Sequence, residues 1–172
     1  MVLKRIDWTW FGIKFMAHVL ALLPIGLLAY QALNDQLGAD PVAALTHSTG
    51  DWTLRFLLLS LAMTPLRLLL KKSWPIRFRR LLGLYCFFYA SMHFCIYLFL
   101  DLGSYWSQIG ADIIKRPFIT VGFSAWLLLI PLAITSNQWM MRKLKKNWLT
   151  LHKLVYVIGV LGVVHYYWLV KS

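Results

Sequence analysis

Acidic residues are scarce in this sequence, and the resulting excess of positive charge indicates which class of partner it binds. Six Asp and Glu residues stand against 18 Lys and Arg residues, which gives a formal net charge of +12. A soluble protein with this excess would suggest nucleic acid as a partner. Here the basic residues lie between apolar runs, where membrane topology and anionic lipid explain them. We therefore expect membrane lipid as a partner and no nucleic acid.

Cysteines are few, and glycine-rich phosphate-binding motifs are missing. The two cysteines, Cys86 and Cys95, are nine residues apart in one apolar run. On a helix that spacing is about 13 Å, which is too far for a disulfide. No glycine fingerprint of the dinucleotide-binding kind is present. The sequence therefore excludes a disulfide between these cysteines and argues against a soluble nicotinamide- or flavin-binding domain.

Long apolar runs dominate what is present. Hydrophobic residues make up 60% of the chain, whereas soluble domains are closer to half apolar. A helix needs roughly 20 apolar residues to cross a bilayer, and in lipid such a run must be helical because its backbone has no water to bond. We predict an all-α integral membrane protein with one domain over residues 1–172, in which the first span is a retained signal anchor. Its five predicted spans cover about residues 10–30, 52–70, 81–100, 118–135 and 149–169.

The basic residues predict which ends of the spans face the cytoplasm. Four of them lie at one set of span ends: Arg55, Lys115, Arg116 and Lys171. The other fourteen lie at the opposite set: Lys4, Arg5, Lys14, Arg67, Lys71, Lys72, Arg77, Arg79, Arg80, Arg142, Lys143, Lys145, Lys146 and Lys153. Since Lys- and Arg-rich flanks stay in the cytoplasm, we predict a cytoplasmic N-terminus.

Two loops on the predicted outer side have helical character. In the loop of residues 31–51, Asp40 followed by Pro41 is typical of a helix start, because Asp caps a helix and Pro suits its first turn. We expect a short interfacial helix there. The loop of residues 101–117 is amphipathic and is expected to form a similar helix.

Three histidines fall within predicted spans at related depths. His93 follows Arg79 by fourteen residues in the third span, and His165 follows His152 by thirteen in the fifth. Each spacing is roughly 20 Å along a helix, so His93 and His165 should share a depth near the outer face, and Arg79 and His152 one near the inner face. Two facing imidazoles can bind one iron from opposite sides. Small residues on these spans would let a flat macrocycle or a neighbouring helix approach: Gly83, Gly159 and Gly162.

The histidines also admit a simpler interpretation. A polar side chain in a span can hydrogen-bond to a neighbouring helix or relay protons, which would make the protein a cofactor-free scaffold or a small transporter. The spacing raises a difficulty too, because thirteen residues rotate His152 about 140° from His165 on a regular helix, so a tilt or a bulge is needed. His18 has no partner at its depth and is expected to be structural. His47 is expected to be a solvated loop residue.

Five motifs together resemble one known family. The motifs are LGADPV, TPLR, RFRRLLGLYCFFYASMH, KRPFITVG and LHKLVYVIGVLGVVHYYW. They closely resemble the MsrQ (YedZ) family, the heme-binding membrane subunit of a bacterial system that repairs oxidised periplasmic methionines. That family belongs to the wider group of ferric-reductase and NADPH-oxidase membrane domains. It has a sixth span after the YYWLVK motif, whereas this sequence stops at Ser172.

The resemblance implies the heme ligands. In the wider group, two histidines on the third span and two on the fifth hold two stacked b hemes. By position, His93 and His165 match the ligands of the outer heme, and His152 matches one ligand of the inner heme. The other inner position is Arg79, which is a poor iron ligand because it is always protonated, but which can pair with a heme propionate. We expect one firmly bound heme b, leave a second open, and add FMN as a cofactor of the family.

The resemblance also implies a function and partners. Electrons would pass from the quinone pool or a reduced flavin, through heme, across the bacterial inner membrane to the periplasmic molybdopterin methionine-sulfoxide reductase MsrP. The chain would be an electron-transfer subunit rather than the catalytic subunit. A stand-alone ferric or quinone reductase is a further alternative. The basic inner rim is interpreted mainly as a topology and lipid signal, and secondarily as an attraction for an anionic flavin or its carrier protein.

Overall fold

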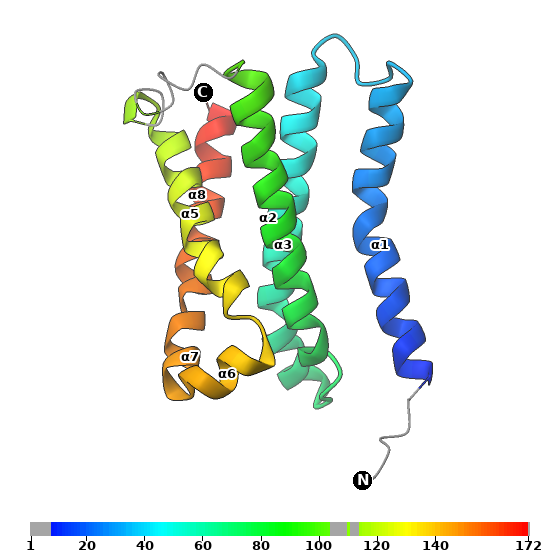
Figure 1. Cartoon of the computed structure of the whole chain (residues 1–172), viewed down its shortest axis with the longest axis vertical. Helices are drawn as coiled ribbons and strands as arrows, with labels where there is room; N and C mark the ends of the chain where they lie inside the picture. The colour runs from blue at the N-terminus through cyan, green and yellow to red at the C-terminus, as the bar shows by residue number, and fades with distance from the viewer. Residues whose placement is uncertain (1–7, 104–109, 111–113, 172) are drawn as a thin grey trace.

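The architecture is a set of upright helices joined by short connections (Figure 1). The computed structural model describes residues 8–103, 110 and 114–171, and no strand occurs among them. Five of its helical segments are long and apolar enough to cross a membrane: Trp8–Leu33, Pro41–Leu70, Ile76–Asp101, Pro117–Ile134 and Lys146–Lys171. The predicted all-α membrane protein with five spans is therefore confirmed.

Two of the five spans are not continuous α-helices. The third continues into a π-helical turn near its end, and the fifth is divided in two after His152. In chain order the elements are α1 (Trp8–Leu33), α2 (Pro41–Leu70), α3 (Ile76–Ile96), η1 (Tyr97–Asp101), α5 (Pro117–Ile134), α6 (Gln138–Leu144), α7 (Lys146–His152) and α8 (Leu154–Lys171).

The second span begins well before its predicted first residue. Asp40 and Pro41 do start a helix, and Asp40 Oδ1 accepts from the N–H of Ala43 at 2.9 Å. The helix is α2 itself, however, so the separate interfacial helix predicted there is wrong. No residue between Pro41 and the predicted start of the span at residue 52 ends the helix. A single glycine inside a helix, here Gly50, only lowers the helix stability slightly. The part of α2 that precedes the predicted span contributes to the site described below.

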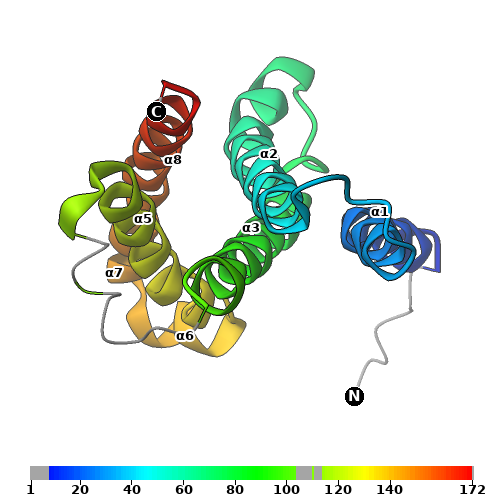
Figure 2. The same cartoon turned by 90° about the horizontal axis from the view of Figure 1, so that it is seen from above.

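Helix packing divides the spans into a bundle of four and one outlying helix. α2 with α3, and α5 with α8, form the most extensive helix pairs. Contacts of α3 with α5 and of α2 with α8 join the two pairs. In the view from above, α1 stands at the side of this four-helix bundle (Figure 2).

A tyrosine from α3 ties α1 to the bundle. The buried Tyr89 hydroxyl donates to the carbonyl of Ala21 at 2.8 Å and accepts from the N–H of Ile25 at 3.2 Å. In an uninterrupted helix those two main-chain groups would bond to each other. Pro24 lies between them and disturbs the helix there, so the inserted hydroxyl satisfies both groups and fixes the position of α1.

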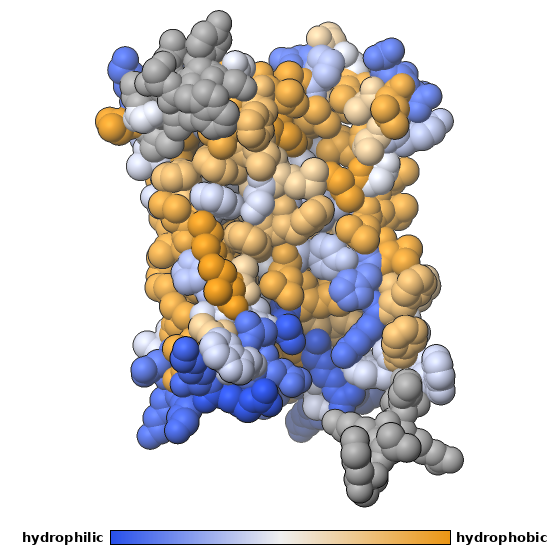
Figure 3. Space-filling model, viewed as in Figure 1, coloured by the Kyte–Doolittle hydropathy of each residue, from blue (hydrophilic) through white to orange (hydrophobic). Residues whose placement is uncertain are grey.

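The surface has an apolar middle and a strongly basic end. Hydrophobic residues cover the middle of the molecule, and hydrophilic residues gather at the end that carries α6 and α7 (Figure 3). We call this the basic end, and define it by Lys71, Lys72, Arg77, Lys143 and Lys145. The opposite end, with the α1–α2 connection and the last turn of α8, is called the far end. An apolar band between polar ends is the surface expected of a protein that spans a bilayer.

Two smaller predictions have different outcomes. Both cysteines are free, Cys86 buried and Cys95 exposed, so the predicted lack of a disulfide is confirmed. The helix predicted in residues 101–117 falls largely outside the described residues.

Candidate functional site

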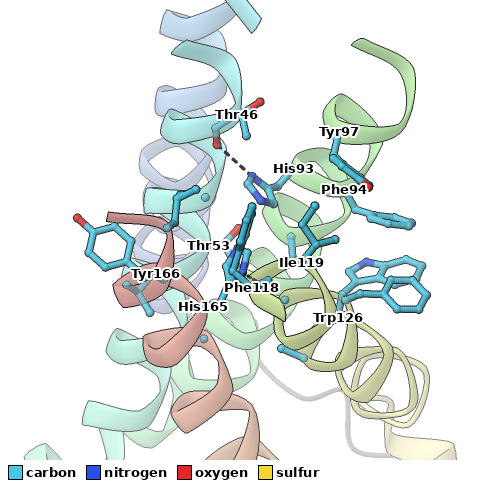
Figure 4. A pocket seen from close by; sticks show the side chains of 18 of the residues that line it. Thr46, Thr53, His93, Phe94, Tyr97, Phe118, Ile119, Trp126, His165 and Tyr166 are labelled. Carbon is cyan, nitrogen blue, oxygen red and sulfur yellow. Dashed lines mark hydrogen bonds between the residues drawn. The ribbon is translucent and has the colours of Figure 1, made fainter. Parts of the chain in front are cut away.

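Two histidines from different helices meet near the far end. His93 on α3 and His165 on α8 have ring centroids 6.2 Å apart, with an angle of 82° between the ring planes. Figure 4 shows both rings beside the same cavity. Since α3 and α8 come from distant parts of the chain, only the equal depth of the two residues in their spans allows this meeting. The shared depth predicted for this pair is confirmed, while their role as ligands stays a prediction.

The hydrogen bonds determine which nitrogen of each ring carries the proton. His93 Nδ1 lies 3.0 Å from the carbonyl of Thr46, and His165 Nδ1 lies 2.7 Å from the carbonyl of Phe118. Thr49 Oγ1 lies 3.4 Å from the same His93 nitrogen, and its own proton goes to the main chain. A carbonyl only accepts, so each Nδ1 must donate and each Nε2 of the neutral rings keeps a free lone pair. This is the form in which histidine binds a metal, with the second nitrogen held by a main-chain carbonyl.

The separation of the rings fits a single metal between them. Within the described part of the chain, neither Nε2 has a hydrogen-bond partner. A metal–nitrogen bond is about 2 Å long and the ring centre lies roughly 1.1 Å behind the nitrogen, so two imidazoles on one metal have centroids about 6.2 Å apart. The observed 6.2 Å agrees with this value.

The cavity beside the rings has the character of a cofactor pocket. Its volume is about 370 Å³, within the usual range for small-molecule sites. Four helices line it, and its walls are mainly apolar, including Leu57, Ala125, Trp126, Leu129 and Ile158. The charged and polar lining residues are few: Asp40, His47, Asp51, Asp101 and Arg116 are among them. The donor set and the apolar walls therefore fit a porphyrin that is held by its iron.

Two glycines that sequence reasoning missed lie against the histidine rings. A Cβ added to Gly122 would lie 2.7 Å from Cε1 and from Nδ1 of His165, and one added to Gly50 would lie 3.2 Å from Cε1 of His93. The rings therefore occupy space that any other residue type would fill. The only signal in the sequence is a glycine within an apolar span, which by itself does not say what approaches it.

The glycines singled out from the sequence have other neighbours. Gly162 does line the cavity. Gly83 faces the Ser60 side chain, and Gly159 faces Leu61, so both allow close contact between helices rather than the approach of a macrocycle. Of the two alternatives left open for these residues, the neighbouring helix applies to Gly83 and Gly159.

His152 lies at the basic end, in different surroundings. Its Nε2 is 3.0 Å from Thr135 Oγ1, and that hydroxyl donates to the carbonyl of Pro131. The Nε2 of His152 is therefore the donor and carries the proton. The ring also stacks on Trp148 at a centroid distance of 4.0 Å. In this arrangement Nε2 is already engaged, so a metal could bind at that atom only in place of Thr135.

Arg79 accompanies His152 at the basic end. It lies near enough for its charge to act on the His152 ring, and its guanidinium donates to Thr64 Oγ1 at 3.4 Å. No cluster of three or more His, Cys, Asp or Glu side chains that could hold a metal ion occurs in the described parts of the chain. The structure thus brings His93 and His165 together as a pair, and leaves His152 and Arg79 as a separate group.

The rotation problem between His152 and His165 is resolved by a break in the span. α7 ends at His152 and α8 begins at Leu154, with Lys153 as a turn residue between them. The bonds Lys153 N–H to Thr150 O and Tyr156 N–H to Lys153 O span three residues instead of four. The two histidines therefore do not lie on one regular helix, and the angle of 140° does not apply.

The other two histidines differ from each other. His18 Nδ1 lies 2.8 Å from the hydroxyl of Tyr85, so it links α1 to α3 and lies away from the cavity. This agrees with the structural role expected of it. His47 was expected in a loop, but it lies on α2, where it lines the cavity and is exposed.

Known proteins similar to this chain include membrane components of reductases. The family described as "Ferric reductase like transmembrane component" matches residues 49–163. The "Protein-methionine-sulfoxide reductase heme-binding subunit MsrQ" of Xanthomonas euvesicatoria pv. vesicatoria (strain 85-10) is 59% identical over 165 residues, which cover 92% of this chain and 76% of that protein. The protein of the same name from Herminiimonas arsenicoxydans is 54% identical over 158 residues, 91% of this chain and 72% of that protein. No solved structure matches.

Proposed function

Because this chain belongs to the MsrQ family of ferric-reductase-like transmembrane components, we propose that it binds heme b between His93 and His165 and carries electrons across the bacterial inner membrane. One observation carries the proposal. Two neutral imidazoles, each with Nδ1 donating to a carbonyl, lie 6.2 Å apart beside an apolar cavity. Interhelical hydrogen bonding alone would not require both rings to leave Nε2 unpartnered on a shared cavity.

The chain's own residues would hold and tune the cofactor. Heme supplies one-electron redox chemistry when it is bound. His93 and His165 would hold the iron through their Nε2 atoms, while the carbonyls of Thr46 and Phe118 keep the rings in the metal-binding tautomer. Leu57 and Ile158 exclude water from the cavity and lower its dielectric constant, which is one of the means by which a protein sets a heme potential.

The basic end is proposed to face the cytoplasm. Its cluster of Lys and Arg residues supports this orientation by the positive-inside rule, and α1 begins at the same end (Figure 1). The histidine pair then lies near the periplasmic face. Electrons would enter at the basic end, from the quinone pool or a reduced flavin such as FMN. They would leave at the far end for a periplasmic methionine-sulfoxide reductase, MsrP, which repairs oxidised proteins.

A second heme is a further part of the proposal. His152 would ligate it at the basic end, and Arg79 would pair with one of its propionates. For this to happen, the bond between His152 Nε2 and Thr135 must give way to the metal. The second heme therefore requires a local rearrangement that the first does not.

The experiment starts from the purified full chain in detergent. We expect a red protein whose Soret band shifts on reduction with dithionite, and whose pyridine hemochrome gives at least one heme per chain. The double variant His93→Ala/His165→Ala is the control. A colourless wild-type protein would instead favour a scaffold or transporter.

Electron transfer needs a second measurement. Quinol or reduced FMN is added to membranes that contain the protein, and the heme band is followed with and without the periplasmic reductase. We expect reduction by the donor and reoxidation only when the reductase and a methionine sulfoxide are both present. Reductase activity towards ferric iron or quinone in a strain that lacks the periplasmic enzyme would favour a stand-alone reductase.

A further inference from the structure

We propose that Gly50 and Gly122 are positioning residues, which fix how the two imidazoles are turned by keeping open the helix carbonyls that hold them. This inference rests on the proposed function, since it takes His93 and His165 as the ligands of one heme iron. It goes further because it assigns the orientation of the ligands to two residues that touch neither iron nor substrate.

The same arrangement occurs on two helices. On α2, the carbonyl of Thr46 accepts from His93 Nδ1, and Gly50 follows four residues later. On α5, the carbonyl of Phe118 accepts from His165 Nδ1, and Gly122 follows four residues later. Four residues is about one helical turn, so each glycine lies beside the carbonyl that its neighbouring histidine uses.

Helix geometry explains why the fourth residue must be small. The Cα–Cβ bond in an α-helix tilts toward the N-terminus, so a side chain covers the turn that precedes it. A side chain at residue 50 or 122 would therefore lie over the carbonyl of residue 46 or 118. Without it, the imidazole of His93 or His165 reaches the carbonyl from the neighbouring helix.

The contact distances show that a side chain would clash more strongly at Gly122 than at Gly50. A Cβ at Gly122 would lie 2.7 Å from two atoms of the His165 ring and 3.1 Å from Cγ, far inside the usual contact of about 3.5 Å. A Cβ at Gly50 would lie 3.2 Å and 3.3 Å from two atoms of the His93 ring. An alanine at 122 must therefore displace the ring, whereas an alanine at 50 needs a shift of only a few tenths of an ångström.

Another glycine of the same cavity provides the contrast. Gly162 also lines the cavity, but a Cβ there would meet only two leucine side chains, Leu57 Cδ2 at 3.4 Å and Leu54 Cδ1 at 3.8 Å, which are ordinary van der Waals contacts. The cavity wall as such does not demand glycine. Among the glycines that line the cavity, glycine is required only at the two positions, 50 and 122, that follow the carbonyls bound by the histidines.

The orientation of the rings has a spectroscopic consequence. The ring planes cross at 82°. When two axial imidazoles cross near a right angle, the two iron d orbitals that overlap with them are nearly equal in energy. Low-spin ferric iron then gives a strongly anisotropic EPR signal, and turning one ring toward the plane of the other reduces the anisotropy. The EPR line shape therefore reports the ring orientation directly.

The test compares wild type with Gly122→Ala, Gly50→Ala and the matched control Gly83→Ala, at a helical glycine outside the cavity where a Cβ would meet only Ser60 Oγ, at 3.6 Å. Each full-length protein is purified, its fold is checked by size exclusion and circular dichroism, and its heme content is measured as the pyridine hemochrome. Low-temperature EPR and a potentiometric titration follow. We expect Gly122→Ala to change the EPR signal and to weaken heme retention about tenfold or more, as loss of ligand support does at metal sites. Gly50→Ala should give a smaller change in the same direction, and Gly83→Ala none.

The contrary results are distinct for the two proposals. Wild-type protein without heme would overturn the proposed function, and this inference with it. A heme-containing wild type whose EPR signal and heme content are unchanged in both Gly122→Ala and Gly50→Ala would overturn this inference alone. If Gly122→Ala does not fold, Gly50→Ala decides, because its small contact leaves room for folding and an unchanged signal there would exclude the positioning role.

Discussion

The two ends of the bundle use histidine in opposite ways. At the far end, His93 and His165 donate from Nδ1 to main-chain carbonyls, and both residues line a cavity. At the basic end, His152 donates from Nε2 to Thr135, and its ring stacks on Trp148. The difference teaches that the position of a histidine in a span does not decide its role. The hydrogen-bond partner of the ring decides, because it determines which of the two nitrogens carries the proton and which keeps a lone pair.

A second contrast lies in the residue that faces each histidine. His93 faces another imidazole, whereas His152 lies near the charge of Arg79. Two neutral rings can share a metal, but a permanently protonated guanidinium next to a ring disfavours a metal cation and attracts an anion. The far end thus offers two imidazoles that could share a metal, whereas the basic end adds a fixed positive charge that attracts an anionic group.

The largest effect is expected when a far-end ligand is removed. His93→Ala or His165→Ala should each abolish the low-spin heme signal and lower the heme content at least about tenfold, because one imidazole alone cannot hold a six-coordinate iron. The measurements are the pyridine hemochrome and EPR. His18→Ala, which removes only the contact with Tyr85, is the control and should keep the heme. Unchanged heme content in both ligand variants would refute the assignment.

Removal of the basic-end histidine should have a smaller effect. His152→Ala should leave the far-end EPR signal unchanged, because the two groups lie at opposite ends of the bundle. The heme content per chain should fall only by the amount of heme bound at the basic end. The difference from wild type therefore measures how much second heme the protein binds. If the far-end signal disappeared as well, the two ends would not be independent sites.

A still smaller effect is expected from the neighbouring charge. Arg79→Ala should slow the reduction of heme by anionic reduced FMN by about twofold to tenfold, since a positive charge near the entry attracts the donor. The rate is measured by stopped flow at low and high salt, and the difference should shrink with salt. Arg79→Lys, which keeps the positive charge at this position, is the matched control. An equal loss of the far-end heme in Arg79→Ala would contradict the separation of the ends.

The smallest change concerns the outlying helix rather than either end. Tyr89→Phe removes the hydroxyl that is inserted into α1 between Ala21 and Ile25. The free energy of unfolding should fall by about 1 kcal/mol, the usual net value of a hydrogen bond within a protein or between membrane helices. Thermal unfolding in detergent measures it, with the heme signal as an internal reference. A simultaneous loss of heme would show that α1 supports the far-end site.

Depth could be predicted from the sequence, but direction could not. The spacing of His93 and His165 from their basic flanks placed them at one height, because rise along a helix depends only on residue number. Which way each ring points depends on neighbouring helices, and those contacts leave no local pattern. Gly50 and Gly122 were missed for that reason, since a glycine in an apolar span has no periodic signal of its own.

The start of α2 illustrates the same limit in the backbone. Asp40 and Pro41 correctly predicted a helix start, because the cap and the fixed proline backbone act on residues adjacent in sequence. The length of the helix does not depend on the residues at its start alone, and the prediction of a separate short helix was wrong. The break after His152 was likewise expected only as some tilt or bulge, whereas the structure has a turn at Lys153.

The sequence by itself determined that this is a helical membrane protein with five spans, and it determined that His93 and His165 lie at one height. Those properties follow from hydrophobicity and residue count, which act along one helix at a time. Only the tertiary structure decided which imidazoles face each other, which nitrogen of each is free, and which glycines make room for them. Those properties arise between helices, where side chains from distant parts of the chain compete for the same carbonyl groups and the same space.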